Sequence, residues 1–318
     1  MRTGFVVPHV GHAATTDALR LVAAEAVNAG AAALWAGDHF ALAAEQETPY
    51  PYGGTAGPAG GRYRVPTDRI FLEAFTTLGY LAALRPDCPL GTSVAILPYR
   101  PHLHWAKLVG TIAYLTEGRF RWGVGEGWLK EEFDALRVGP FADRRPWTDD
   151  VVRFVRGVWD EDPRSASYHS AYADIKAMSV VPSGQEYRPE VWIGGNGPSA
   201  LRRVARLGDT WHPHVRGLPP DAVANGRERI AELRREEYPD SPGRLPAPPV
   251  ALFSPLRITE DRPAEPPWTA GRIDGPASYI ADVLQEYEAA GVEEIVLSIG
   301  GSARTRLTTV ETIASALS

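Results

Sequence analysis

The chain has 318 residues, a formal net charge of −6 at pH 7 and one cysteine, Cys88. This length suffices for one barrel-sized domain, the acidic balance argues against a nucleic-acid partner, and a lone cysteine excludes a disulfide framework and a cysteine-based zinc site. We expect a cytoplasmic protein without a membrane span, because the chain starts directly with a strand pattern and no apolar run approaches the roughly 18–20 residues of a span.

The first half of the chain predicts alternating strands and helices. The expected strands cover residues 4–7, 32–36 and 90–97 and the start of 119–133, and the expected helices cover 17–28 (capped by Thr16), 68–84 and 102–115. Residues 40–66 form a long segment rich in proline and glycine that contains Tyr50, Tyr52 and Tyr63. A loop of this length inside a compact domain is usually functional or disordered, and its aromatic residues favour a lid on the substrate side.

The second half continues the alternation. Strands are expected at 191–194, 210–212, 250–258 and 294–299, and helices at 144–159, 199–207, 220–238 and 305–317, with one more helix between a cap at Asp274 and Gly291. Eight strands alternating with helices predict an α/β fold with a parallel sheet, and eight is the number that closes a (β/α)8 TIM barrel. We therefore expect residues 1–318 to form a single TIM-barrel domain with insertion segments near 40–67 and 162–189, the latter able to form a hairpin.

Polar residues follow several of the predicted strands. Asp38-His39, Ser93-Val94, Glu126, Gly194–Gly197 and Trp211-His212 all fall at carboxyl ends of strands. In a closed barrel these ends meet at one mouth, where active sites are built. Each has a structural alternative: Asp38 and Glu126 could cap a turn or helix, and His39 could be an ordinary loop histidine.

Glycines surround two of these positions. Gly123, Gly125 and Gly127 flank Glu126 and would let a bulky ligand approach the backbone. The Gly194–Gly197 turn before a helix can bind an anion through backbone N–H groups and the helix dipole, although a plain turn fits equally well. Neither a P-loop nor a G-x-G-x-x-G motif is present, which argues against ATP and a Rossmann-bound dinucleotide. A catalytic metal is not expected, because the pairs His102/His104 and His212/His214 have no acidic partner at a recognisable spacing.

Five stretches in order, at 33–40, 90–101, 115–133, 191–211 and 286–297, resemble the luciferase-like monooxygenase superfamily. Within it they resemble the branch of oxidoreductases that uses the 5-deazaflavin coenzyme F420. The resemblance covers nearly the whole chain. It implies a TIM barrel with the flavin or deazaflavin ring in its mouth, a small-molecule substrate and a homodimer.

The resemblance also implies residue roles. Ser93-Val94 would form a non-proline cis peptide behind the ring, Gly194 and Gly195 would hold the coenzyme phosphate, and Asp38 would contact the polar edge of the ring. His39 would act as base on a substrate hydroxyl, and Glu126 would supply or take a proton at the coenzyme. The other expected coenzyme contacts are Gly125, Gly127, Asn196, Gly197 and Trp211.

The sequence departs from the family pattern at two places. Many relatives have an apolar residue where Glu126 stands, which favours a proton-transfer role for it here. Sugar-phosphate-oxidising relatives have an asparagine where this chain has Leu129, and their phosphate-binding basic residues are not evident. A sugar phosphate is therefore not the expected substrate, and the lid should set specificity.

Three functions remain open at this point. The first is hydride transfer between F420 and a small organic substrate, with His39 and Glu126 moving protons. The second is an FMN-dependent monooxygenase that uses O₂ and reduced flavin from a partner reductase. The third is a coenzyme-binding protein without turnover.

Overall fold

The computed structural model describes residues 1–52, 61, 70–239 and 246–317, with side chains left out at 303 and 314–317. Its centre is a closed barrel of parallel strands in the order β12-β1-β2-β3-β5-β8-β9-β10, which closes through pairing of β10 with β12. These strands are β1 (Arg2–Val6), β2 (Leu34–Ala36), β3 (Leu90–Thr92), β5 (Phe120–Gly125), β8 (Glu190–Gly194), β9 (Thr210–His212), β10 (Val250–Ile258) and β12 (Val292–Ile299). The predicted (β/α)8 barrel is confirmed.

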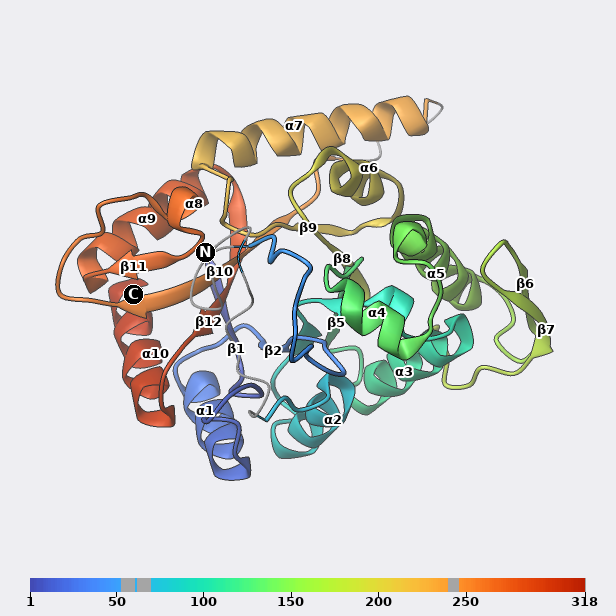
Figure 1. Ribbon diagram of the computed structural model, residues 1–318, viewed down its shortest axis with the longest axis horizontal. Coiled ribbons are helices and arrows are strands. Elements are labelled where there is room, and N and C mark those ends of the chain that lie inside the picture. Colours follow the sequence, from blue (N-terminus) through green and yellow to red (C-terminus); the bar gives the residue numbers. More distant parts are fainter. Residues whose placement is uncertain (53–60, 62–69, 240–245, 318) are drawn as a thin grey trace.

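Helices surround this barrel (Figure 1). They are α1 (Thr16–Asn28), α2 (Ala74–Leu84), α3 (His102–Leu115), α4 (Lys130–Leu136), α5 (Arg144–Asp160), α6 (Pro198–Leu207), α7 (Pro220–Glu237), α8 (Pro267–Ala270), α9 (Ala277–Ala289) and α10 (Ala303–Leu317), with short 3-10 turns η1 (Leu97–Tyr99) and η2 (Phe141–Asp143). The strands β6 (Ala166–His169) and β7 (Asp174–Met178) form an antiparallel hairpin at the edge of the molecule. This hairpin is the one expected within 162–189.

The helices pack on the barrel through the faces that the sequence pattern predicts. In α9 the buried side chains are Ile280, Val283, Leu284 and Tyr287, which share one side of a helix because they recur at three- and four-residue intervals. Tyr287 also donates its hydroxyl to the carbonyl of Leu218 at 2.8 Å. The amphipathic pattern therefore predicted the buried face of this helix.

The inside of the barrel is filled by side chains. Trp35 and Trp192 are in contact there, with ring centroids 4.7 Å apart. Gly91 makes room for them, because a Cβ at this position would lie 2.2 Å from the Trp35 ring. Arg121 and Glu294 form an ion pair of 2.6 Å close to these rings. A ligand is therefore expected at the mouth of the barrel and not within it.

Several element boundaries differ from the sequence-based expectation. The helix expected from Asp68 begins at Ala74, where Glu73 caps it by accepting from Thr76 N; residues 62–69 lie outside the described part. Thr15, not Thr16, caps α1. The expected cap role of Asp274 is wrong, because Asp274 lies in β11 (Ile273–Gly275) and pairs there with Arg257 and Arg272.

The third predicted strand, 90–97, is interrupted. A cis peptide between Ser93 and Val94 separates β3 from β4 (Ala95–Ile96), and β4 pairs with β5. The non-proline cis peptide that the family resemblance implied at this position is confirmed. A short helix follows the Glu126 turn, as α4, and it contributes to the site described next.

Candidate active site

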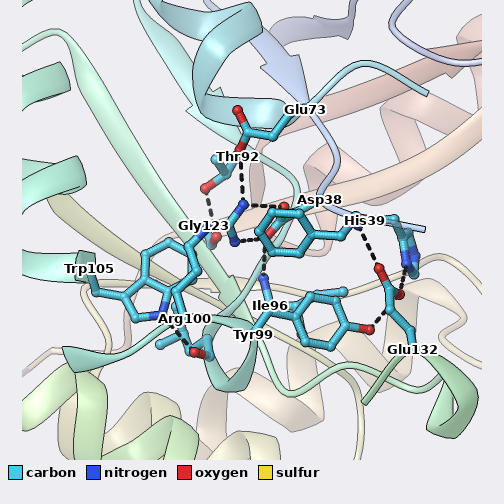
Figure 2. A network of polar contacts seen from close by, with 12 residues as sticks. Asp38, His39, Glu73, Thr92, Ile96, Tyr99, Arg100, Trp105, Gly123 and Glu132 are labelled. Carbon is cyan, nitrogen blue, oxygen red and sulfur yellow. Dashed lines mark hydrogen bonds and ion pairs between the residues drawn. The ribbon is translucent and has the colours of Figure 1, made fainter. Parts of the chain in front are cut away.

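The strand β2 delivers Asp38 and His39 to the barrel mouth. Asp38 is buried, and its carboxylate accepts two hydrogen bonds from Arg100, at 2.7 and 2.9 Å, and one from Ile96 N at 3.0 Å. Arg100 also binds Glu73 at 2.9 Å (Figure 2). Asp38 therefore anchors the chain just after the cis peptide. The predicted contact of Asp38 with a coenzyme ring stays a prediction. Both carboxylate oxygens of Asp38 already accept from Arg100, so such a contact would have to share one of them.

His39 is held by a carboxylate that the sequence analysis did not single out. Its Nδ1 lies 2.6 Å from Oε2 of Glu132, whose side chain is fully buried at the start of α4. Glu132 also accepts from Tyr99 OH at 2.6 Å and from the backbone N–H groups of Phe40 and Ala41 at 2.6 and 3.0 Å (Figure 2). Glu132 is part of the run L-K-E-E-F at 129–133, but nothing in this run points to its partners, which lie 33 to 93 residues away in the sequence.

The charge of Glu132 follows from these contacts. Burial alone would raise the pKa of Glu132, but hydrogen bonds from His39, Tyr99 and Ala41 N outweigh it and hold the pKa below its ordinary value. A carboxylate only accepts hydrogen bonds, so Nδ1 of His39 is the donor. In the neutral ring the lone pair is then on Nε2, which leaves this nitrogen as the basic atom.

Aromatic rings from the segment after β2 cross the mouth. Trp128 lies edge-on to His39, with centroids 6.1 Å apart, and Tyr50 packs on Trp128 at 5.1 Å. Tyr52 follows Tyr50 at 5.7 Å and stacks on His214 at 5.0 Å, at the far side of the mouth after β9. The described residues 40–52 thus lie where the lid was expected, whereas Tyr63 and most of 53–66 fall outside the described part.

The cis peptide and the glycines form one wall of the mouth. The side chain of Val94 packs against Gly125 and Gly194; a Cβ at Gly125 would lie 2.6 Å from Val94 Cγ2, and one at Gly194 3.2 Å from Val94 Cγ1. Ser93 Oγ contacts His212 Nε2 at 2.9 Å. Gly127 has φ +74°, a left-handed conformation that favours glycine. Glycine at 125 and 194 therefore makes room for the Val94 side chain.

The turn at 194–197 leads into α6. Gly195 has φ +110°, and Gly197 precedes the helix without a side chain to cap it. The Asn196 amide is occupied, since it donates to the carbonyls of His214 and Arg216 at 2.7 and 2.8 Å and accepts from His214 N at 2.9 Å. Asn196 can therefore meet a ligand through its backbone only.

Trp211 lies behind this turn. Its indole donates to the carbonyl of Gly195 at 2.9 Å, and the ring packs against α7, where a Cβ at Gly226 would lie 2.5 Å from it. The side chain is 1 % exposed. Trp211 thus supports the glycine turn from the side of α7. It would act on a coenzyme by holding the Gly195 backbone in place.

Glu126 lies at the mouth between two arginines. Its carboxylate accepts from Arg145 Nε at 3.0 Å and from Arg203 at 3.4 Å, and Arg203 is buried and also paired with Asp149. Burial and the charge of Glu126 both raise the pKa of Tyr52, and Glu126 directly follows β5, whose end faces the same mouth as the ends of β2 and β8. His39, Glu126 and the glycine turn are therefore on the same rim, with the lid rings between them.

Two negative findings bear on the function. Within the described ranges, no group of three or more histidine, cysteine, aspartate or glutamate side chains could hold a metal ion. In those same ranges, no helix combines the length and the apolar character that crossing a membrane would require.

Sequence relatives are found in mycobacteria. An uncharacterised protein of Mycobacterium tuberculosis is 31 % identical over 220 residues, which is 69 % of this chain and 72 % of the relative. A phthiodiolone/phenolphthiodiolone dimycocerosates ketoreductase of Mycobacterium kansasii is 30 % identical over 201 residues, or 60 % of this chain and 51 % of the relative. The match thus spans about half of the ketoreductase.

Solved structures share the fold. An F420-dependent secondary alcohol dehydrogenase, solved with an F420-acetone adduct, has a TM-score of 0.77 at 14 % identity and covers 100 % of this chain and 99 % of its own. The FMN-bound oxygenating constituent of 3,6-diketocamphane monooxygenase from Pseudomonas putida has a TM-score of 0.66 at 13 % identity, covering 99 % and 96 %. The family model of luciferase-like monooxygenases matches residues 1–265. This chain belongs to the luciferase-like monooxygenase family.

Proposed function

We propose that this protein is an oxidoreductase that transfers a hydride between coenzyme F420 and a small organic substrate of the alcohol or ketone class. The observation that carries the proposal is the pairing of His39 Nδ1 with the buried carboxylate of Glu132 at 2.6 Å, on the rim that also bears the Val94 wall. Interconversion of an alcohol and a ketone moves a proton together with the hydride, and a held imidazole can handle that proton.

The residues at the mouth fit a flat ring with a phosphate-bearing tail. Val94 would offer an apolar surface to the ring, and Gly125 and Gly194 let its side chain pack closely against the strand ends. At the start of α6, Pro198 has no N–H group and Ala200 N donates to Gly197 O at 2.9 Å, so a phosphate there would be met by Ser199 N and by the backbone N–H groups of the 194–197 turn. These features would hold either F420 or FMN, so the fit supports a coenzyme of this type and does not separate the two.

The bound coenzyme would supply or accept the hydride. In the oxidation direction, Nε2 of His39 would take the proton of the substrate hydroxyl, and the negative charge of Glu132 would stabilise the resulting imidazolium. Tyr50, Tyr52 and Trp128 would exclude water from the reacting groups. Glu126 would exchange a proton or balance charge at the coenzyme; its ion pairs with Arg145 and Arg203 favour the second role.

The first test is coenzyme choice. Purified protein is titrated separately with F420 and with FMN while coenzyme fluorescence is followed; secondary alcohols are then added to the complex with oxidised F420, and ketones to the complex with reduced F420. We expect saturable binding of F420 and a change in its absorbance on adding substrate. Binding of FMN, with substrate-dependent O₂ consumption when the flavin is supplied in its reduced form, would instead support the monooxygenase, and binding of a coenzyme without reaction towards either substrate class would support a non-catalytic role.

The second test concerns His39. We expect His39→Ala to bind F420 as the wild type does while turnover falls about 10²- to 10⁴-fold, the usual contribution of a general acid–base group. The matched control is His169→Ala, since His169 lies on the β6–β7 hairpin with 85 % of its side chain exposed. Full turnover by His39→Ala with coenzyme bound would refute the assignment.

The FMN-dependent monooxygenase stays the second candidate because an FMN-bound structure shares this fold. That function would require a partner reductase to supply reduced flavin. A homodimer is proposed for either function and can be checked by light scattering of the purified protein.

A further inference from the structure

Two neighbouring glutamates on α4 hold the lid, and one of them also contacts His39. Glu131 accepts from Thr48 N at 2.8 Å and from Thr48 Oγ1 at 2.6 Å. Glu132 accepts from the backbone at Phe40 and Ala41 and, in addition, from His39 Nδ1. Both side chains therefore hold residues 40–48 through hydrogen bonds, but only Glu132 of the two also binds the His39 imidazole.

The donors around Glu132 fix which nitrogen of His39 carries the proton. Oε1 receives two backbone N–H groups, and Oε2 receives the Tyr99 hydroxyl together with Nδ1 of His39. Burial first, and then the charge of Glu132, raise the pKa of Tyr99, so its hydroxyl stays protonated and donates. With only donors around it, the carboxylate selects the Nδ1–H tautomer.

The other titratable groups near His39 do not take over this role. His9 lies close to His39, but burial lowers the pKa of His9 to about 4, so it is uncharged near neutral pH. The charge of Asp38 is matched by Arg100, which binds both of its oxygens and also Glu73. Among the described residues, Glu132 is thus the carboxylate in hydrogen-bond contact with the imidazole, and its charge lies directly beside Nδ1 of His39.

We infer that Glu132 is the positioning residue for His39: it fixes the Nδ1–H tautomer, turns Nε2 towards substrate and stabilises the protonated ring. This inference rests on the proposed function for its catalytic meaning. The tautomer and its dependence on Glu132 can be measured whether or not that function is correct. Glu131 provides a control with the same chemistry one residue away.

The first measurement uses nitrogen-15 NMR of the histidine side chains in the wild type, Glu132→Gln and Glu131→Gln, with the His39 signal assigned from its loss in His39→Ala. We expect the neutral wild-type ring to be Nδ1–H. Glutamine in place of Glu132 brings an NH₂ group among four donors, so we expect His39 to shift towards Nε2–H, whereas Glu131→Gln keeps the wild-type tautomer.

The second measurement is the pH profile of kcat/KM with F420 and a secondary alcohol. Removing the negative charge beside the imidazole disfavours its protonated form, so the acidic limb should move to lower pH in Glu132→Gln, with kcat reduced at least tenfold and F420 affinity retained. Glu131→Gln loosens the lid and should change KM while the acidic limb stays in place. The two variants therefore separate positioning of the base from fastening of the lid.

The outcomes distinguish this inference from the proposed function. A tautomer change in Glu132→Gln, in a protein that turns over no alcohol or ketone, would refute the proposed function and support the positioning role. An Nε2–H tautomer in the wild type would overturn the inference, and this result does not depend on the folding of any Glu132 variant. A wild-type tautomer and an unmoved acidic limb in folded Glu132→Gln would also overturn it.

Discussion

Ser93 Oγ lies 2.9 Å from Nε2 of His212, which joins the cis peptide after β3 to the end of β9. Nδ1 of His212 donates to the carbonyl of Ala251 at 2.6 Å, so Nε2 accepts from the serine hydroxyl and the ring is neutral. Burial lowers the pKa of His212 to about 4. Two further buried histidines at the barrel mouth accept hydrogen bonds from backbone N–H groups. His9 accepts from Gly37 N, and His214 accepts from Arg216 N.

These three histidines predict a loss of stability in mild acid. Burial lowers the pKa of His9 to about 4 and that of His214 to about 3, whereas an unfolded histidine has a pKa of about 6.5. Between these values the unfolded chain binds more protons than the folded one, so the free energy of unfolding falls as the pH falls from about 6.5 to about 4. At pH 5, about 1.5 units below the pKa of the unfolded histidine, each of the three contributes about 2 kcal/mol to this loss, since one pKa unit corresponds to about 1.4 kcal/mol.

Urea unfolding at pH 7.5, 6 and 5 measures this effect. The curve for His169→Gln should run parallel to that of the wild type, because that exposed residue has no buried acceptor role. An unfolding free energy that stays constant between pH 7.5 and 5 would contradict the prediction.

The ion pair between Asp38 and Arg100 predicts a large loss of stability in Asp38→Asn. Both side chains are buried, with exposures of 0 and 3 %, and the asparagine would leave the guanidinium without its two-oxygen partner. Breaking such a buried pair costs about 3–5 kcal/mol. Glu73→Gln removes the charge of the other partner of Arg100, which is one-third exposed, and leaves one acceptor oxygen for both Arg100 and the α2 cap, so it should cost about 1 kcal/mol, less than Asp38→Asn. Chemical denaturation of both variants decides the order, and equal losses would count against this account.

Two helical glycines should respond to alanine with opposite signs. An alanine Cβ at Gly79 in α2 would meet nothing within 4 Å, so the gain in helix propensity should stabilise the protein by about 0.5–1 kcal/mol. At Gly110 in α3 the Cβ would lie 2.3 Å from the carbonyl of Pro182, so Gly110→Ala should cost about 1–3 kcal/mol. Thermal unfolding of the two variants compares them directly, and a stabilised Gly110→Ala would contradict the packing described here.

The sequence predicted the features that depend on local pattern. α3 begins and ends at the expected residues, and α9 buries the expected face, because strong periodicity and the adjacent proline and glycine define them locally. The positions of His39 and Glu126 at strand ends were also correct, since a parallel barrel brings all such ends to one rim.

The partners of these residues could not be predicted. Glu132 and His39 are 93 residues apart, and nothing local distinguishes Glu132 from Glu126 or Glu131. Side-chain contacts across the mouth depend on how α4 is packed, and α4 has only seven residues, too few for a clear amphipathic pattern. The same holds for Asp38, whose partner Arg100 is 62 residues away.

The wall formed by Val94 gives a prediction about coenzyme binding. A methyl group at Gly125 would lie 2.6 Å from Val94 Cγ2, so Gly125→Ala must displace Val94 from its place between Gly125 and Gly194. We expect the affinity for F420 to fall at least tenfold, or about 1.4 kcal/mol. Gly157→Ala is the control, because a Cβ at that position of α5 would meet nothing within 4 Å.

The measurement is a fluorescence titration of both variants with F420, alongside circular dichroism to confirm that each is folded. Weakened binding in Gly125→Ala alone would support contact between the coenzyme and this wall, because the substituted atom faces Val94 and no other part of the proposed site. Equal affinities in folded Gly125→Ala and Gly157→Ala would mean that the coenzyme does not use the Val94 surface, and the ring would then have to lie elsewhere on the rim.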